Sequence, residues 1–264
     1  QDRGHDRLMR ALAAGLIVLA AAAPAAAAER WTRLFDGKSL KGWTPKILGL
    51  PAGEDPLRTF RVEDGRIVVS YDQYGGAFRN RFGHLFWKTP YRAYRLRMEY
   101  RFVGTWPADT ADWAKGNSGV MIHAQAPSTM AIGQPFPVSL EVQYLGVVPG
   151  QTRTTGNLCT PGLNVEMAGK LVTQHCNAAS APAAPFGEWV KVEAEVSPSG
   201  RVVHRINGQD VIAYDAPQYD PTDRTATPLI AAAGGALAVN GGYIALQSEG
   251  SPVEFRRIEI LELR

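Results

Sequence analysis

The sequence predicts an all-β fold in which two antiparallel sheets pack face to face as a sandwich or jelly roll. About a dozen short segments alternate between apolar and polar residues with the period of two that is typical of strands. Turns rich in glycine, proline and asparagine separate them, and the chain contains 27 glycines and 18 prolines. No convincing helical pattern follows the N-terminal segment. The remaining roughly 235 residues suit one large β domain.

The N-terminal segment has the features of an export signal. Arg3, Arg7 and Arg10 precede an apolar run over residues 12–23, and an alanine tract follows. The run is shorter than the roughly 20 apolar residues that span a bilayer, which disfavours the alternative of a membrane anchor. We therefore expect a signal peptide over residues 1–28 and a mature domain over residues 29–264. The mature protein would be periplasmic or secreted, with no stable membrane insertion after signal removal.

The charge of the chain argues against a nucleic-acid partner. The formal net charge is +3, and three of the positive residues lie in the expected signal. Removing these three arginines while retaining the acidic residues brings the charge close to neutrality. Nucleic-acid-binding domains instead carry a clear basic excess.

The first half of the mature chain contains seven expected strands. A short strand at 31–35 ends in an Asp-Gly turn, and an Asp64-Gly65 turn joins the next two strands into a hairpin. The strand at 94–102 alternates between apolar and charged residues, so one of its faces meets solvent. In order, the strands are 31–35, 60–62, 66–71, 85–89, 94–102, 116–125 and 139–145.

The second half begins with a turn-rich segment and continues with further hairpins. Asn207-Gly208 is a strong two-residue hairpin signal between two apolar runs. The expected elements are the turn-rich 153–162, a strand pair around 167–170, and strands at 189–196, 202–206, 211–214, 242–247 and 253–260.

The two cysteines, Cys159 and Cys176, are expected to form a disulfide. An even pair in an exported protein is usually bridged. Closing this loop would stabilise the fold by about 3 kcal/mol in the chain-entropy model. The alternative is a pair of thiols that binds a soft metal beside His175, although a structural zinc site normally needs four ligands.

Two adjacent strands suggest a polar site. Side chains alternate across a strand, so Glu141 and Gln143 share one face of the strand at 139–145. On the strand at 116–125, His123 and Gln125 share a face in the same way. Pairing the two strands would gather these four side chains into one patch.

Several stretches resemble the bacterial 3-keto-disaccharide hydrolase domain, a concanavalin A-like jelly-roll family. They occur in the family's order and span nearly the whole mature chain. The matching stretches are Leu34–Leu40 with Gly42-Trp43, Asn117-Ser118-Gly119, Leu140–Gln143, Ile206-Asn207-Gly208, Gly242–Gln247 and Val253–Ile258. The resemblance implies a glycoside or oligosaccharide substrate oxidised to a ketone at C3.

A 3-keto sugar can be cleaved with a single base. The ketone acidifies the proton at C2, and the resulting enolate can expel the leaving group at C1, after which water adds. We expect Glu141 to be the base and His123 the acid or oxyanion partner, with His175 as a second candidate for the acid.

Other residues are candidates for binding the sugar. Gln143, Asn117 and Gln125 would hydrogen-bond hydroxyl groups, and Trp87 or Tyr74 would stack on a ring. Two cations, Arg79 and Lys88, are expected at the surface, where they could also reach a ligand.

Two other functions and a metal site remain open alternatives. A noncatalytic glycan-binding module would use the same fold. Ordinary two-carboxyl hydrolysis would need a partner for Glu141, such as Glu99 or Glu166. No cofactor is expected from a ligand-spacing motif, but a divalent metal could be held by His123, His175 and Glu141 if they converge.

Overall fold

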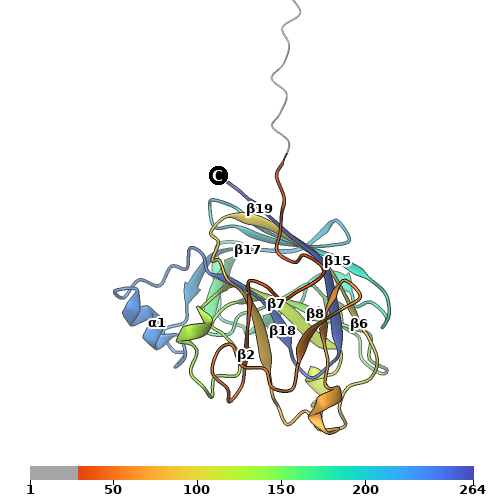
Figure 1. Cartoon of the computed structure of the whole chain (residues 1–264). Coiled ribbons are helices and arrows are strands. Elements are labelled where there is room, and N and C mark those ends of the chain that lie inside the picture. Colours follow the sequence, from red (N-terminus) through yellow and green to blue (C-terminus); the bar gives the residue numbers. More distant parts are fainter. Residues whose placement is uncertain (1–28) are drawn as a thin grey trace, which may run out of the picture.

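The computed structural model describes residues 29–264, which form two antiparallel sheets packed face to face (Figure 1). The all-β prediction is therefore confirmed. The expected signal peptide, residues 1–28, lies outside the described residues.

The larger sheet brings together strands from both halves of the chain. Its strand order is β12 (Lys170–Val172), β11 (Leu163–Met167), β17 (Gln209–Tyr219), β16 (Val202–Ile206), β15 (Val190–Val196), β6 (Tyr94–Phe102), β19 (Val253–Glu262), β4 (Arg66–Val69) and β3 (Phe60–Glu63), with β1 (Thr32–Arg33) pairing to β19.

The smaller sheet carries the two strands that the sequence singles out, as immediate neighbours at its centre. Its order is β13 (Cys176–Asn177), β10 (Asn157–Cys159), β8 (Leu140–Leu145), β7 (Asn117–Ala124), β18 (Tyr243–Ser248), β5 (Gly83–Trp87) and β2 (Trp43–Ile47). A two-stranded ladder joins β14 (Ala181–Pro182) to β9 (Thr154–Thr155).

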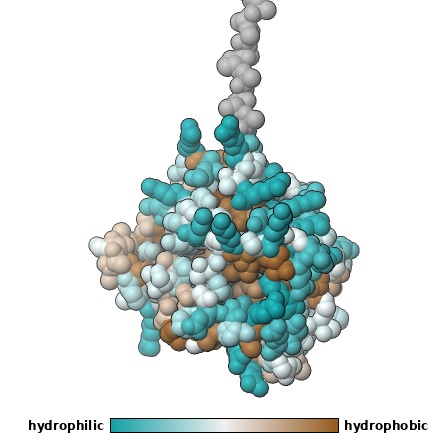
Figure 2. Space-filling view, in the orientation of Figure 1, coloured by the Kyte–Doolittle hydropathy of each residue, from teal (hydrophilic) through white to brown (hydrophobic). Residues whose placement is uncertain are grey.

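Four short helical segments connect the strands. They are the 3₁₀ turns η1 (Asp72–Tyr74), η2 (Asp112–Ala114) and η3 (Pro127–Thr129), and the α-helix α1 (Thr227–Ala232). The expectation of no helix after the signal is thus wrong at α1. This helix has only six residues, too few to show the repeating apolar positions by which a longer helix is recognised in a sequence. Figure 2 shows the apolar residues of this region at the surface.

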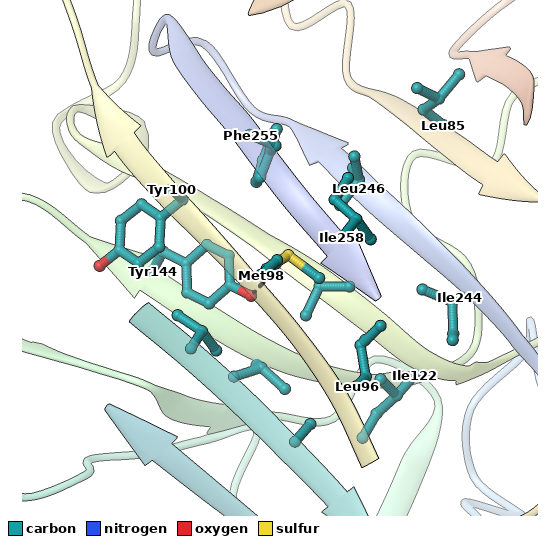
Figure 3. Packing of buried hydrophobic residues seen from close by; sticks show 14 of the residues in the cluster. Leu85, Leu96, Met98, Tyr100, Ile122, Tyr144, Ile244, Leu246, Phe255 and Ile258 are labelled. Carbon is teal, nitrogen blue, oxygen red and sulfur yellow. Dashed lines mark hydrogen bonds between the residues drawn. The ribbon is translucent and has the colours of Figure 1, made fainter. Parts of the chain in front are cut away.

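The core lies between the two sheets. Tyr100 of β6 stacks on Tyr144 of β8 with ring centroids 4.1 Å apart, and Figure 3 shows Leu96 and Ile122 meeting across the same interface. Because these residues fill one face of β7 and β8, the alternate side chains of both strands must project from the opposite face. We call this outer face of the smaller sheet the cleft face.

Candidate active site

A cleft of about 350 Å³ lies on the cleft face. Three residues expected at the site, Glu141, Gln143 and Asn117, line it together. Of the four side chains expected to form one patch, Glu141 and Gln143 lie together here, and Asn117, expected separately to bind the sugar, lies beside them.

Glu141 projects from β8 over a glycine of the neighbouring strand. The ladder pairs Glu141 with Met121 and Gln143 with Gly119. A methyl group on Gly119 would lie 2.8 Å from Glu141 Oε1, so the glycine leaves the space that the carboxyl occupies. The residue is 6 % exposed, and its Oε1 has no hydrogen-bond partner among residues 29–264.

Glu249 supplies a second carboxyl to the same cleft, and sequence reasoning missed it. It follows the last residue of β18 and is 4 % exposed. Its Oε2 likewise has no partner in the described part of the chain. Both carboxyls expected as alternatives lie elsewhere: Glu99 binds two arginines on the other sheet, and Glu166 lies on β11.

The two cleft carboxyls hold their protons more tightly than ordinary glutamates. Burial raises the pKa of Glu141 to about 8, and the nearby Gln247 amide lowers it only in part. Burial also raises the pKa of Glu249, and the charge of Glu141 raises it further, while Arg153 acts in the opposite direction. The guanidinium of Arg153 is held by main-chain oxygens, including that of Lys115 at 2.6 Å.

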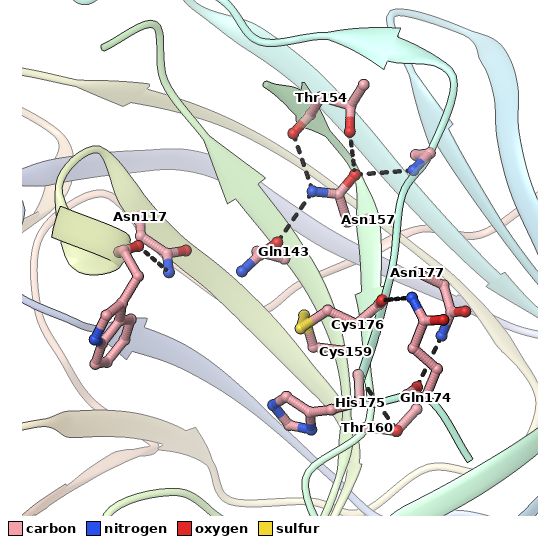
Figure 4. The surroundings of a disulfide bond; sticks show 12 residues. Asn117, Gln143, Thr154, Asn157, Cys159, Thr160, Gln174, His175, Cys176 and Asn177 are labelled. Carbon is pink, nitrogen blue, oxygen red and sulfur yellow. Dashed lines mark hydrogen bonds between the residues drawn. A yellow bond between two sulfur atoms is a disulfide. The ribbon is translucent and has the colours of Figure 1, made fainter. Parts of the chain in front are cut away.

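Two amides border the carboxyls. Asn117 donates from Nδ2 to the main-chain oxygen of Trp113 at 3.2 Å, and its Oδ1 has no partner within residues 29–264. Gln143 accepts a 3.0 Å hydrogen bond from Asn157 through Oε1, which fixes its side chain and leaves its Nε2 for a ligand (Figure 4).

The expected disulfide between Cys159 and Cys176 is confirmed. It joins directly opposed residues of β10 and β13, and it lines the cleft beside Glu141 (Figure 4). His175 precedes the bridge and also lines the cleft, with an exposed side chain. The bridge therefore fixes one wall of the site and places His175 at its rim.

His123 does not join Glu141, so the expected grouping of these two residues is wrong. The pairing of β7 with β18 shifts register between Tyr243 and Ala245, and His123 has a positive φ of 51°. This bulge turns the imidazole to the ring of Tyr94, and it lines a separate cavity. A bulge reverses the face that simple alternation assigns.

Gln125 is engaged by the loop that follows β7 rather than by the cleft. Its Oε1 accepts hydrogen bonds from Gln134 and the Val138 main chain, both at 2.8 Å, and its Nε2 donates to Thr129. These bonds anchor the loop over residues 127–137.

The remaining sequence candidates lie outside the cleft. Trp87 packs edge-on against Trp43, and the ammonium of Lys88 lies over the Trp87 ring. Tyr74 is buried and hydrogen-bonds Thr59. Arg79 is exposed in a turn.

Trp113, an aromatic residue that the sequence analysis did not select, also lines the cleft. Its side chain is 52 % exposed and stacks on Phe82 with centroids 5.8 Å apart. An exposed, rigidly supported indole is a suitable platform for the apolar face of a sugar.

Neither a metal cluster nor a membrane-spanning helix is found among residues 29–264. No three His, Cys, Asp or Glu side chains there are arranged to hold an ion, so His123, His175 and Glu141 do not converge in the way that the metal alternative requires. No helix in this part of the chain is long and apolar enough to cross a bilayer.

Comparisons with known proteins give a family and a fold. The family model described as the 3-keto-alpha-glucoside-1,2-lyase-like domain matches residues 30–261. Two crystal structures of candidate glycosyl hydrolases from Parabacteroides distasonis ATCC 8503 are similar. One has a TM-score of 0.52 at 21 % identity, covering 89 % of this chain and 94 % of that one. The other has a TM-score of 0.51 at 17 % identity, covering 89 % of this chain and 100 % of that one. No curated protein sequence gives a significant match.

Proposed function

Because the chain belongs to the family of 3-keto-alpha-glucoside-1,2-lyase-like domains, we propose that it cleaves the glycosidic bond of 3-keto glycosides. Family membership supports a carbohydrate-active function. The observation that carries the finer proposal is Glu141, a buried carboxyl with an unpartnered oxygen and a raised pKa in a cleft. The disulfide is in keeping with an oxidising compartment, and hence with an exported protein.

Glu141 acts as the general base. Its ionised carboxylate takes the proton from C2 of the sugar, and the C–H electron pair forms the enolate with the C3 ketone. The enolate then collapses, which restores the ketone, forms the C1–C2 double bond and breaks the bond from C1 to the leaving oxygen. A base is most effective when its pKa lies near the working pH, as a pKa of about 8 does.

Glu249 acts as the general acid. Once Glu141 is ionised, its negative charge opposes ionisation of Glu249, so this carboxyl keeps the proton that the leaving oxygen needs. Water added to C1 of the unsaturated product completes a net hydrolysis. The amides of Asn117 and Gln143 are available to hydrogen-bond the sugar, and Trp113 to stack on it.

A second candidate function rests on the same pair of carboxyls. Two carboxyl groups in one cleft, one ionised and one protonated, are also what ordinary glycoside hydrolysis requires. In that case the enzyme would cleave an unoxidised glycoside, and no ketone would be needed.

Product analysis separates these functions. Purified protein is incubated with a 3-keto-glucoside and with its unoxidised parent, and products are identified by mass spectrometry for wild type, Glu141→Gln and the control Glu166→Gln. We expect cleavage of the keto sugar alone, lost in Glu141→Gln and retained in Glu166→Gln. Cleavage of the parent would favour ordinary hydrolysis. Binding of the sugars without turnover of either would favour a glycan-binding module.

A further inference from the structure

A row of polar side chains continues from the cleft across the smaller sheet. The pairing of β7 with β8 sets Gln143 opposite Gly119. The pairing of β7 with β18 sets Leu246 opposite Val120, and the next pair in this register is Gln247 with Gly119. Gln247 in turn pairs with His84, and His84 with Lys46. Alternation places these side chains on the cleft face, because Leu246 and Leu85 between them belong to the core.

His84 and Gln247 are buried without partners. Both are 0 % exposed. Within residues 29–264, neither ring nitrogen of His84 has a hydrogen-bond partner. The Gln247 amide approaches the Glu141 carboxyl, but neither of its polar atoms makes a hydrogen bond of normal geometry. Nearly all buried polar atoms of native proteins are paired, since an unmade hydrogen bond destabilises the fold. Four such atoms on adjacent strands next to a cleft indicate a site whose partners come from outside the chain.

The chemistry of the row fits hydroxyl groups. Burial and the nearby Lys46 lower the pKa of His84 to about 3, so its imidazole is neutral and offers one donor and one acceptor. Gln247 offers two donors and an acceptor. The ammonium of Lys46 is directed at the main-chain oxygens of Ile47 and Ile132, which leaves the row without a free cation for an anionic ligand.

Phe136 lies between His84 and the open cleft. Its ring meets the edge of His84 at a centroid distance of 5.9 Å and also lines the cleft. It packs on Phe82 at 5.0 Å and is itself half-buried. The open cleft, at about 350 Å³, is at the small end of ligand pockets, which typically measure about 300–1,000 Å³.

We propose that His84 and Gln247 form a second sugar-binding subsite, which joins the cleft when Phe136 moves aside and which hydrogen-bonds the second ring of a disaccharide substrate. This inference rests on the proposed function for its substrate class. The cleft would then hold the sugar ring whose C1 bond is cleaved, and His84 and Gln247 would hold the neighbouring ring.

His204 provides a matched control. It is also 0 % exposed, but its Nδ1 is bonded to the Gly156 oxygen at 2.9 Å and its Nε2 to the Tyr214 hydroxyl at 2.8 Å. Replacing His204 by leucine leaves the Gly156 oxygen and the Tyr214 hydroxyl without their hydrogen-bond partner and must lower the stability of the fold. Replacing His84 by leucine leaves no other group without a partner and removes two unpaired nitrogen atoms.

The test compares His84→Leu with His204→Leu in the full chain. We expect His84→Leu to raise KM for a 3-keto-disaccharide at least tenfold, to leave KM for methyl 3-keto-glucoside within twofold, and not to lower the urea midpoint. His204→Leu should lower that midpoint. The proposal is overturned if His84→Leu leaves the disaccharide KM within twofold, changes both substrates equally, or lowers the midpoint as His204→Leu does.

Binding of the disaccharide provides a readout that does not need turnover. Its dissociation constant is measured by calorimetry in wild type if the sugar is not cleaved, and otherwise in the inactive Glu141→Gln background, and the ring signals of His84 and His204 are followed by NMR. If wild type binds the sugar without cleaving it, the proposed function fails. The subsite still stands if His84→Leu weakens binding tenfold and only the His84 signals shift. No binding by wild type, or unshifted His84 signals, would overturn the subsite.

Discussion

The outer faces of the two sheets carry buried carboxyls of opposite kinds. On the larger sheet each is paired with guanidinium groups: Glu99 binds Arg256 at 2.6 Å and Arg257 at 2.8 Å, and Glu254 binds Arg101 at 2.7 Å. On the cleft face Glu141 and Glu249 each have an oxygen with no partner among residues 29–264. We call the outer face of the larger sheet the ion-pair face.

This difference separates carboxyls that support the fold from carboxyls that are available for chemistry. A carboxylate between arginines is held ionised and in place, so it neither takes up a proton at neutral pH nor reaches a substrate. An unpaired buried carboxyl destabilises the fold and is kept near neutrality by its raised pKa. The cleft face is therefore where a base and an acid are expected.

The largest effect should come from Glu249→Gln, which keeps the shape of the second carboxyl but removes its proton donor. We expect kcat on the 3-keto glycoside to fall about 10²- to 10⁴-fold, the usual contribution of general acid catalysis. The free energy of unfolding should not fall, since no ion pair is broken. A substrate with a better leaving group, such as a nitrophenyl 3-keto-glucoside, should restore most of the rate. Equal losses on both substrates would contradict the role of acid.

Gly119→Ala should displace Glu141 without changing its carboxyl group. The added methyl group would lie 2.8 Å from Glu141 Oε1, so the carboxyl must shift. A displacement of about 1 Å can reduce the rate about 10²-fold. Steady-state kinetics should show this loss in kcat, and Gly133→Ala, at a position where a methyl group meets open space, should not. Unchanged kcat in Gly119→Ala would mean that the placement of Glu141 does not matter for the reaction.

Alternation found only part of the cleft. It places Glu141 and Gln143 on one face, as the structure does, because β8 is a regular strand. It failed at His123, because the bulge near the end of β7 depends on the neighbouring strand β18 and leaves no local pattern.

The other misses have a different origin. Glu249 directly follows β18 and Trp113 lies in the 3₁₀ turn η2, so strand alternation assigns neither side chain to a face. Glu99 was a reasonable second carboxyl until its arginine partners were known, and they come from β19, about 157 residues later in the chain. The sheet order, and not the sequence, decides which carboxyls are paired.

Glu99→Gln should lower the stability of the fold and leave kcat unchanged, whereas the cleft variants should lower kcat. Its side chain is 8 % exposed and bonded to two arginines. Losing charge-assisted hydrogen bonds of this kind should lower the free energy of unfolding by about 1.5–3 kcal/mol. Urea denaturation measures this, and kcat at a temperature where the variant is folded should equal that of wild type. A loss of kcat in the folded variant would make the ion-pair face part of the site.

The stability contributions of the two faces should also change in opposite directions with pH. Per pH unit, this is the smallest of the expected effects. The pKa of Glu141 is about 8 in the folded protein, above its ordinary 4.5. Between these values the folded state keeps a proton that the unfolded state has lost. The contribution of Glu141 to the free energy of unfolding is therefore complete below about pH 4.5. It falls by up to about 1.4 kcal/mol per pH unit as the pH rises toward 8.

Glu99 behaves in the opposite sense. Burial alone would raise its pKa, but Arg256 and Arg257 hold it below 4.5, so its stabilisation is present above that pH and is lost in acid. Unfolding measured by urea from pH 3 to pH 8 should therefore give Glu141→Gln a stability advantage over wild type that grows from pH 5 to pH 8. The deficit of Glu99→Gln should instead shrink below pH 4.5. Parallel curves for the two variants would mean that both carboxyls ionise alike, and the distinction between the faces would be lost.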